Sequence, residues 1–110
     1  FLTPRGPSPS GFALPAAIAA HLAHPDRRVV CFVGTSELAA ATSALETAAR
    51  LRARVAIIAF AIDGPDAAAS MAQAERLHVS ASAVAGEARF AQALGRALVA
   101  EGPALIVVQP

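Results

Sequence analysis

The hydrophobic residues follow two alternating patterns along the chain. Uninterrupted apolar runs, which are typical of strands buried on both faces of a parallel sheet, occur at 29–33, 55–60 and 104–108. A further short strand is predicted at 79–84. Apolar residues at intervals of three or four, which predict helices, occupy about 14–24, 37–52, 66–77 and 87–101. Helices that alternate with strands predict an α/β fold. We expect a three-layer α/β/α arrangement with a mainly parallel sheet and right-handed crossovers.

Each predicted helix has an apolar stripe that should face the sheet. In chain order, the stripes are Leu14, Ile18 and Leu22; Leu38, Ala41, Leu45, Ala48 and Ala49; Ala69, Met71, Ala72 and Leu77; and Phe90, Leu94, Ala97 and Leu98. Proline and glycine interrupt the chain between these elements and crowd its first residues. We therefore expect a Pro/Gly-rich loop at 1–10 and a single α/β domain at 11–110.

The amino-acid composition excludes several classes of function. A net charge of +1 and an aromatic content limited to five Phe give no basis for binding nucleic acid. All basic residues are Arg, so no lysine can form a Schiff base or bind phosphate. The single cysteine allows no internal disulfide and favours a reducing, cytoplasmic location. No apolar run is long enough to span a membrane.

Chemistry is expected at the carboxyl ends of the strands, where open parallel sheets bind ligands. Three turns lie there: Gly34-Thr35-Ser36, residues 61–64, and residues 81–87. The glycine of the first turn allows close approach of a ligand, and the helix that follows offers free N–H groups to a phosphate. The simpler interpretation is a tight turn with a hydroxyl cap.

The remaining reactive side chains have structural explanations. His21 and His24 lie on one helix face and could form half of a metal site, but an exposed surface pair is the simpler interpretation. Cys31 should be an inert core thiol with a raised pKa. Asp63 and Asp66 are interpreted as turn residues around Gly64-Pro65.

One run of residues carries a family resemblance. It consists of Gly11-Phe12-Ala13-Leu14-Pro15-Ala16-Ala17-Ile18-Ala19-Ala20, then His24-Pro25-Asp26-Arg27-Arg28-Val29-Val30, then Gly34. This run resembles the carboxy-terminal, diphosphate-binding domain of thiamine-diphosphate enzymes of the acetolactate synthase and benzoylformate decarboxylase group. The family pattern fits without a gap from about residue 6 to residue 62, and it resumes at 65–106. The resemblance implies the thiamine-diphosphate-binding fold and thiamine diphosphate with Mg²⁺ as cofactor.

The resemblance also implies where a metal would bind. In the family, a Gly-Asp-Gly turn and an Asn-Asn pair after the next strand hold Mg²⁺, which bridges the two phosphates of the cofactor and neutralises them. The metal-binding Asp falls on Thr35, and the metal-binding Asn falls on Ile62 with Ala61 before it. A backbone-carbonyl ligand falls near Gly64. Because neither a carboxylate nor an amide is present, no metal ligand is expected, and Mg²⁺ and cofactor binding should be weakened or lost.

Further contacts with the cofactor follow from the same alignment. They fall on Ser10, where the backbone would meet the aminopyrimidine ring, and on Gly34, Thr35 and Ser36. A bulky residue that supports the bent cofactor in the family falls on Ala40. The segment that closes over the cofactor is much shorter here. The family's activating Glu lies on a separate amino-terminal domain, so this chain alone should be inactive, with no catalytic residue of its own.

Three functions remain open from the sequence. The first is a cofactor-binding domain or subunit of a 2-oxo-acid decarboxylase or acetolactate synthase-like enzyme. The second is a non-catalytic, degenerate member of the family that acts as a structural or partner-binding domain. The third is a metal-free anion or nucleotide binder at Gly34-Thr35-Ser36. We expect a homodimer formed near residues 11–24, or a partner chain that supplies the pyrimidine-binding domain.

Overall fold

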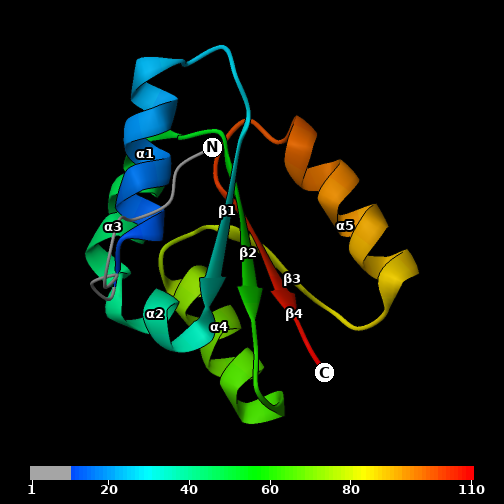
Figure 1. Cartoon of the computed structure of the whole chain (residues 1–110). Coiled ribbons are helices and arrows are strands. Elements are labelled where there is room, and N and C mark those ends of the chain that lie inside the picture. The colour runs from blue at the N-terminus through cyan, green and yellow to red at the C-terminus, as the bar shows by residue number, and fades with distance from the viewer. Residues whose placement is uncertain (1–10) are drawn as a thin grey trace.

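The computed structural model describes residues 11–110, in which nine elements follow one another from α1 to β4 (Figure 1). The predicted loop at 1–10, and Ser10 with it, lies outside the described residues. The helices are α1 (Ala13–Ala23), α2 (Thr35–Ala40), α3 (Thr42–Leu51), α4 (Gly64–Arg76) and α5 (Glu87–Val99). The strands are β1 (Val29–Gly34), β2 (Val55–Phe60), β3 (Ser80–Val84) and β4 (Ala104–Val108).

The strands form one parallel sheet with the order β1-β2-β4-β3. The register places Gly34 opposite Phe60, and Phe60 opposite Val108. The carboxyl ends of β1, β2 and β4 therefore lie side by side at one edge of the sheet. Since α2 follows β1 and α4 follows β2, the first turns of both helices meet at this edge (Figure 1).

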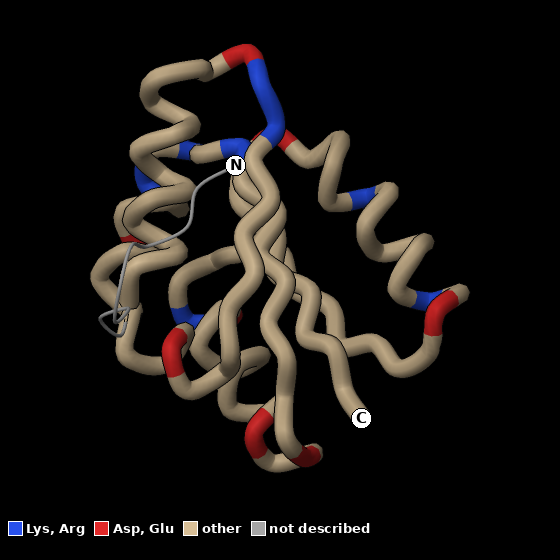
Figure 2. The backbone as a smooth tube through the Cα atoms, in the orientation of Figure 1, with Lys and Arg blue, Asp and Glu red and all other residues tan. Residues whose placement is uncertain are grey.

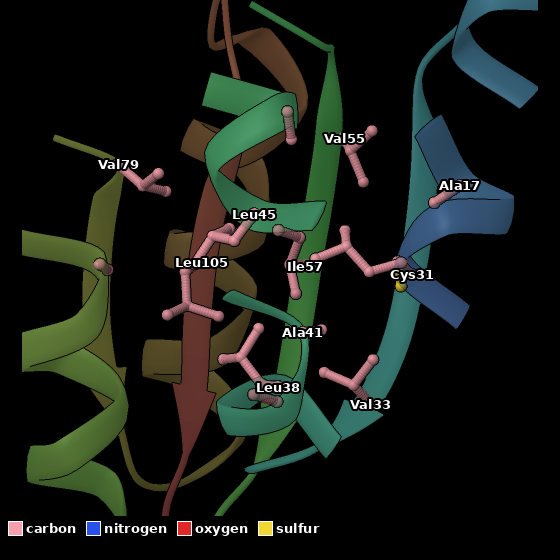
Figure 3. Packing of buried hydrophobic residues seen from close by; sticks show 14 of the residues in the cluster. Ala17, Cys31, Val33, Leu38, Ala41, Leu45, Val55, Ile57, Val79 and Leu105 are labelled. Carbon is pink, nitrogen blue, oxygen red and sulfur yellow. The ribbon is translucent and has the colours of Figure 1, made fainter. Parts of the chain in front are cut away.

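Helices cover both faces of the sheet, which confirms the predicted α/β fold. One core cluster joins α1, α2, α3 and α4 to one face, and Figure 3 shows Leu38, Leu45 and Ile57 packed together within it. A second, smaller cluster joins α5 to the opposite face through Ala93, Ala97 and their neighbours. The helical connections lie on different faces because the chain moves outward from β1 to β3 and then returns to β4.

The face that α5 covers is only half shielded. α5 contacts β2, β3 and β4, and Val30, Phe32 and Phe60 remain exposed on the β1–β2 side. The rings of Phe32 and Phe60 stack with their centroids 6.4 Å apart. This open apolar surface, made of Val30, Phe32 and Phe60, is called the open face below.

The predicted helix over 37–52 is divided, and this expectation was wrong. α2 ends at Ala40 and α3 begins at Thr42, because Ala41 leaves the helical conformation and donates its N–H to the Leu38 carbonyl. The side-chain amide of Gln73 donates to the Leu38 carbonyl at 3.1 Å and to the Thr42 hydroxyl at 2.9 Å. A side chain from a distant helix therefore provides hydrogen bonds at the break.

Two other helices bury only part of the residues expected to face the core. Leu14 and Ile18 are buried as predicted, and Met71 packs against the core. α4 buries Ala67, Ser70, Gln73 and Ala74, whereas Ala69 and Ala72 are exposed. In α1, His21 is buried, whereas Leu22 is exposed. Alanine-rich helices have little contrast between their faces, so the pattern alone predicts the inward face poorly.

α4 begins within the segment that was interpreted as a turn. Asp63 is its N-cap, and the Asp63 carboxylate accepts the N–H of Asp66 at 2.8 Å. Pro65 lies in the first helical turn, where its missing N–H costs nothing. Among residues 11–110, no helix has the length and apolarity needed to cross a membrane.

Candidate functional site at the carboxyl edge of the sheet

The β1–α2 turn forms one side of the candidate site. Gly34 has an extended conformation, with φ −83° and ψ 156°, so the turn does not require glycine for its backbone angles. A Cβ added at Gly34 would meet nothing within 4 Å, so the space beside the turn is open. Thr35 begins α2 and is buried, whereas Ser36 is exposed.

A hydrogen-bond network joins this turn to the β2–α4 turn. The Thr35 hydroxyl donates to Oδ2 of Asp66, although the two residues are 31 positions apart in the chain. The same oxygen accepts the backbone N–H of Ile62 at 2.9 Å. Asp66 thus links the two positions onto which the family's metal ligands fall, and we call these three residues the Asp66 clamp.

The clamp perturbs the titration of Asp66. The hydrogen bond from Thr35, followed by the one from the Ile62 backbone, holds the pKa of the Asp66 carboxyl below its usual value. Both bonds favour the charged form, because an ionised carboxylate is the stronger acceptor. At neutral pH, this edge of the sheet therefore carries a negative charge next to Thr35.

The residues do not fit Mg²⁺ in the manner of the family. The Thr35 hydroxyl is a donor to Asp66, and Ile62 has an apolar side chain that is 82% exposed. A hard cation needs several oxygen ligands in an ordered shell. Within residues 11–110, no three His, Cys, Asp or Glu side chains gather closely enough to hold a metal ion. Ala40, at the position of the family's supporting residue, is exposed at the end of α2.

Formal charge is distributed unevenly over the molecule. Figure 2 shows acidic segments at the carboxyl edge, where Glu37, Asp63 and Asp66 lie, and basic segments at the opposite edge near the start of β1 and β2. A diphosphate approaching the carboxyl edge would meet carboxylates instead of cations. This distribution disfavours anion binding at Gly34-Thr35-Ser36 through long-range repulsion.

The other reactive residues lie away from this edge. His21 is buried, and its Nδ1 accepts the backbone N–H of Arg54 at 3.4 Å, so the expected exposed pair with His24 is wrong. His24 follows α1 and is exposed. Cys31 is buried in the core as predicted, and burial, reinforced by the charge of Glu37, raises the pKa of its thiol to about 11.

The sequence indicated neither the role of Asp66, which was interpreted as a turn residue, nor the role of Gln73 at the break between α2 and α3. The spacing of Asp63 and Asp66 does match an N-cap followed by a first-turn acid, and this signal could have predicted the start of α4. Nothing local in the sequence indicates that Asp66 reaches Thr35 or that Gln73 reaches Leu38, because both partners are more than thirty residues away.

Both the sequence and the fold of this chain are similar to those of known proteins. Residues 1–61 match the family described as "Thiamine pyrophosphate enzyme, C-terminal TPP binding domain". The large subunit of acetolactate synthase isozyme 1 from Escherichia coli (strain K12) is 45% identical over 58 residues, which are 53% of this chain and 10% of that protein. The thiamine diphosphate-dependent 4-hydroxybenzoylformate decarboxylase of Rhodococcus jostii RHA1 has a similar structure, with a TM-score of 0.79 and 31% identity over 90% of this chain. This chain covers 23% of the decarboxylase.

Proposed function

Since the chain belongs to the family of C-terminal TPP-binding domains of thiamine pyrophosphate enzymes, we propose that it is such a domain with its metal-dependent cofactor binding weakened or lost. The enzyme class that it fits is the 2-oxo-acid decarboxylase and acetolactate synthase group, to which the similar proteins belong. One observation carries the proposed loss: the residues at both side-chain metal positions, Thr35 and Ile62, instead hydrogen-bond to Asp66.

The loss follows from charge. A diphosphate brings several negative charges, and a bridging Mg²⁺ normally offsets them. Here the Ile62 side chain offers no ligand, and the Asp66 carboxylate adds a negative charge of its own. The N–H groups at the start of a helix offset only about half an elementary charge. Thiamine diphosphate, the cofactor that the family implies, should therefore bind this chain poorly, whether or not Mg²⁺ is present.

Calorimetric titration of thiamine diphosphate, with and without Mg²⁺, tests the proposal. We expect no binding tighter than about 100 μM, which corresponds to roughly −5.5 kcal/mol, under either condition. A combined Thr35→Asp, Ile62→Asn and Asp66→Asn variant should gain Mg²⁺-dependent affinity, because it supplies the missing ligands and removes the competing carboxylate. Ser43→Asp with Val99→Asn, at exposed positions away from the edge, should gain none. Tight Mg²⁺-dependent binding by the unaltered chain would contradict the proposal.

A second candidate function is a non-catalytic structural or partner-binding domain. The outward side of α1 favours it, because Pro15, Ala19, Leu22 and Ala23 are exposed and none of them is charged. An apolar helix surface of this kind supports association with another protein surface. Weak cofactor binding together with stable association would favour this function over that of a cofactor-binding subunit.

For the partner, we propose a homodimer through α1 or a second chain that supplies the pyrimidine-binding domain with its activating Glu. Sedimentation at increasing protein concentration tests the homodimer. Leu22→Glu should shift the equilibrium toward monomer, because it introduces a charge into the apolar surface, whereas Glu46→Gln on α3 should leave it unchanged. An unaltered chain that stays monomeric at high concentration would argue against the homodimer.

We also propose a cytoplasmic location, in which the single thiol stays reduced.

A further inference from the structure

We infer that Asp66 is a positioning residue that ties the two turns at the carboxyl edge together, between the two positions onto which the family's metal ligands fall. Asp66 would hold the edge in shape where the metal ligands are absent, a role that the proposed function does not require. From the sequence, Asp66 was interpreted only as part of a turn.

The geometry of the Asp66 clamp supports this role. Thr35 is the first residue of α2 and is only 4% exposed. Its hydroxyl therefore needs a hydrogen-bond partner inside the protein. Oδ2 of Asp66 provides that partner and simultaneously accepts the N–H of Ile62, which follows β2. One carboxylate oxygen thereby links the end of β1 to the end of β2, just where the two neighbouring strands stop.

Electrostatics favour the carboxylate at this position. Asp66 lies in the first turn of α4, where the helix dipole stabilises negative charge. The backbone N–H of Asp66 donates to the Asp63 carboxylate. This hydrogen bond stabilises the first turn of α4, in which Asp66 lies. The clamp is therefore supported by the same residues that start α4.

A second hydrogen-bonded contact holds α4 in the orientation that the clamp requires. Gln73 lies seven residues, or about two turns, after Asp66 and therefore projects from nearly the same side of the helix. Its amide donates to the carbonyl of Leu38 and to the hydroxyl of Thr42. α4 is thus fastened to the α2–α3 region near both of its ends, so that Asp66 faces Thr35.

The clamp also uses the donors that an incoming phosphate would need. The Thr35 hydroxyl and the Ile62 N–H both point to Asp66, so a phosphate oxygen would have to displace a carboxylate to reach either of them. The arrangement gives the edge a bridge that does not depend on a metal. It also makes that edge a poor anion site.

A double-mutant cycle tests the clamp. The cycle uses Thr35→Val, Asp66→Ala and the double variant, each unfolded with urea. Each single variant should lower the equilibrium constant for folding several-fold. The double variant should lose little more stability than the more destabilised of the two single variants. Thr35→Ser, which keeps the hydroxyl, should stay close to the unaltered protein. The matched control pairs Thr35→Val with Glu75→Ala, an exposed acid later in α4, and its effects should be additive.

A spectroscopic readout keeps the test decisive if the double variant does not fold. NMR titration should place the pKa of Asp66 below its usual range in the unaltered chain, and Thr35→Val should raise that pKa. Additive losses of stability in the main cycle would overturn the inference. So would an Asp66 pKa that Thr35→Val leaves unchanged.

Magnesium separates this inference from the proposed function. Addition of Mg²⁺ should leave the thermal midpoint of the unaltered chain unchanged, because no cation bridges the turns. A Mg²⁺-dependent rise of that midpoint without Thr35–Asp66 coupling would overturn the inference. Tight Mg²⁺-dependent binding of thiamine diphosphate with the coupling intact would overturn the proposed function and support the clamp.

Discussion

Leu45 and Phe32 are both apolar, but they differ in burial. Leu45 is completely buried between α3 and the sheet, whereas Phe32 is 61% exposed on β1. Leu45→Ala should therefore lower the free energy of unfolding by about 2–5 kcal/mol, from lost burial and a cavity. Phe32→Ala should cost less than about 1 kcal/mol. Urea unfolding with an unchanged m-value measures both, and equal losses would contradict the assigned packing.

The Cys31 thiol should make stability depend on alkaline pH. Burial raises its pKa to about 11 in the folded protein, against about 8.5 in the unfolded chain. The unfolded state therefore loses its proton first as the pH rises, and the free energy of unfolding falls between these two values. Cys31→Ala should flatten this slope. An unchanged slope in the Cys31→Ala variant would show that another group causes it.

At the residue scale, the sequence predicted burial better than it predicted contacts. Cys31 lies in an uninterrupted apolar run, so its burial could be inferred from its neighbours alone. The burial of His21 depends on an N–H of Arg54, which is 33 residues away. The role of Asp66 likewise depends on a distant hydroxyl. Such pairings arise only when the strands are assembled, so local patterns could not indicate them.

At the scale of the elements, strands were easier to predict than helices. β2 and β4 begin and end where predicted, and Arg54 and Pro103 mark the starts of their apolar runs. The segment over 37–52 has a continuous helical pattern and is nevertheless divided at Ala41. Gln73 provides the tertiary hydrogen bonds at the division, and tertiary contacts commonly override local helix propensity.

The division of this segment leads to a prediction about Gln73. Gln73→Leu should lower the free energy of unfolding by about 1–3 kcal/mol, because it removes a buried hydrogen bond to the Leu38 carbonyl and a partly buried one to the Thr42 hydroxyl. Ala69→Leu introduces the same side chain at an exposed position of α4 and should stay within about 0.5 kcal/mol of the unaltered chain. Chemical denaturation of both variants makes the comparison. A costly Ala69→Leu with a harmless Gln73→Leu would support the α4 face that the sequence first predicted.

At the scale of the whole molecule, alternation of strands and helices was sufficient to predict a layered parallel sheet. It could not give the strand order, because β3 and β4 have similar lengths and either could have paired with β2. The coverage of the sheet also follows from that order. α5 spans only the β2, β4 and β3 part of its face, so the β1–β2 part is left as the open face.

The open face predicts a measurable exposure of apolar surface. Two Phe side chains that are at least half exposed leave on the order of 200 Å² uncovered, which approaches the size of patches that bind other surfaces. A hydrophobic dye such as ANS should therefore bind the folded chain. Phe32→Ser with Phe60→Ser should reduce the dye signal, while the circular dichroism spectrum stays close to that of the unaltered chain.

A matched variant separates the open face from the exposed side of α1. Leu22 is 60% exposed but lies on a helix, apart from the stacked rings of Phe32 and Phe60. Leu22→Ser should therefore leave most of the dye signal in place. The stacked pair offers a flat, contiguous surface, whereas a single leucine does not, and contiguity is what distinguishes a binding patch from scattered apolar residues. If Leu22→Ser lowers the signal as much as the double phenylalanine variant does, the dye is bound on α1 and the open face is not the dominant apolar surface.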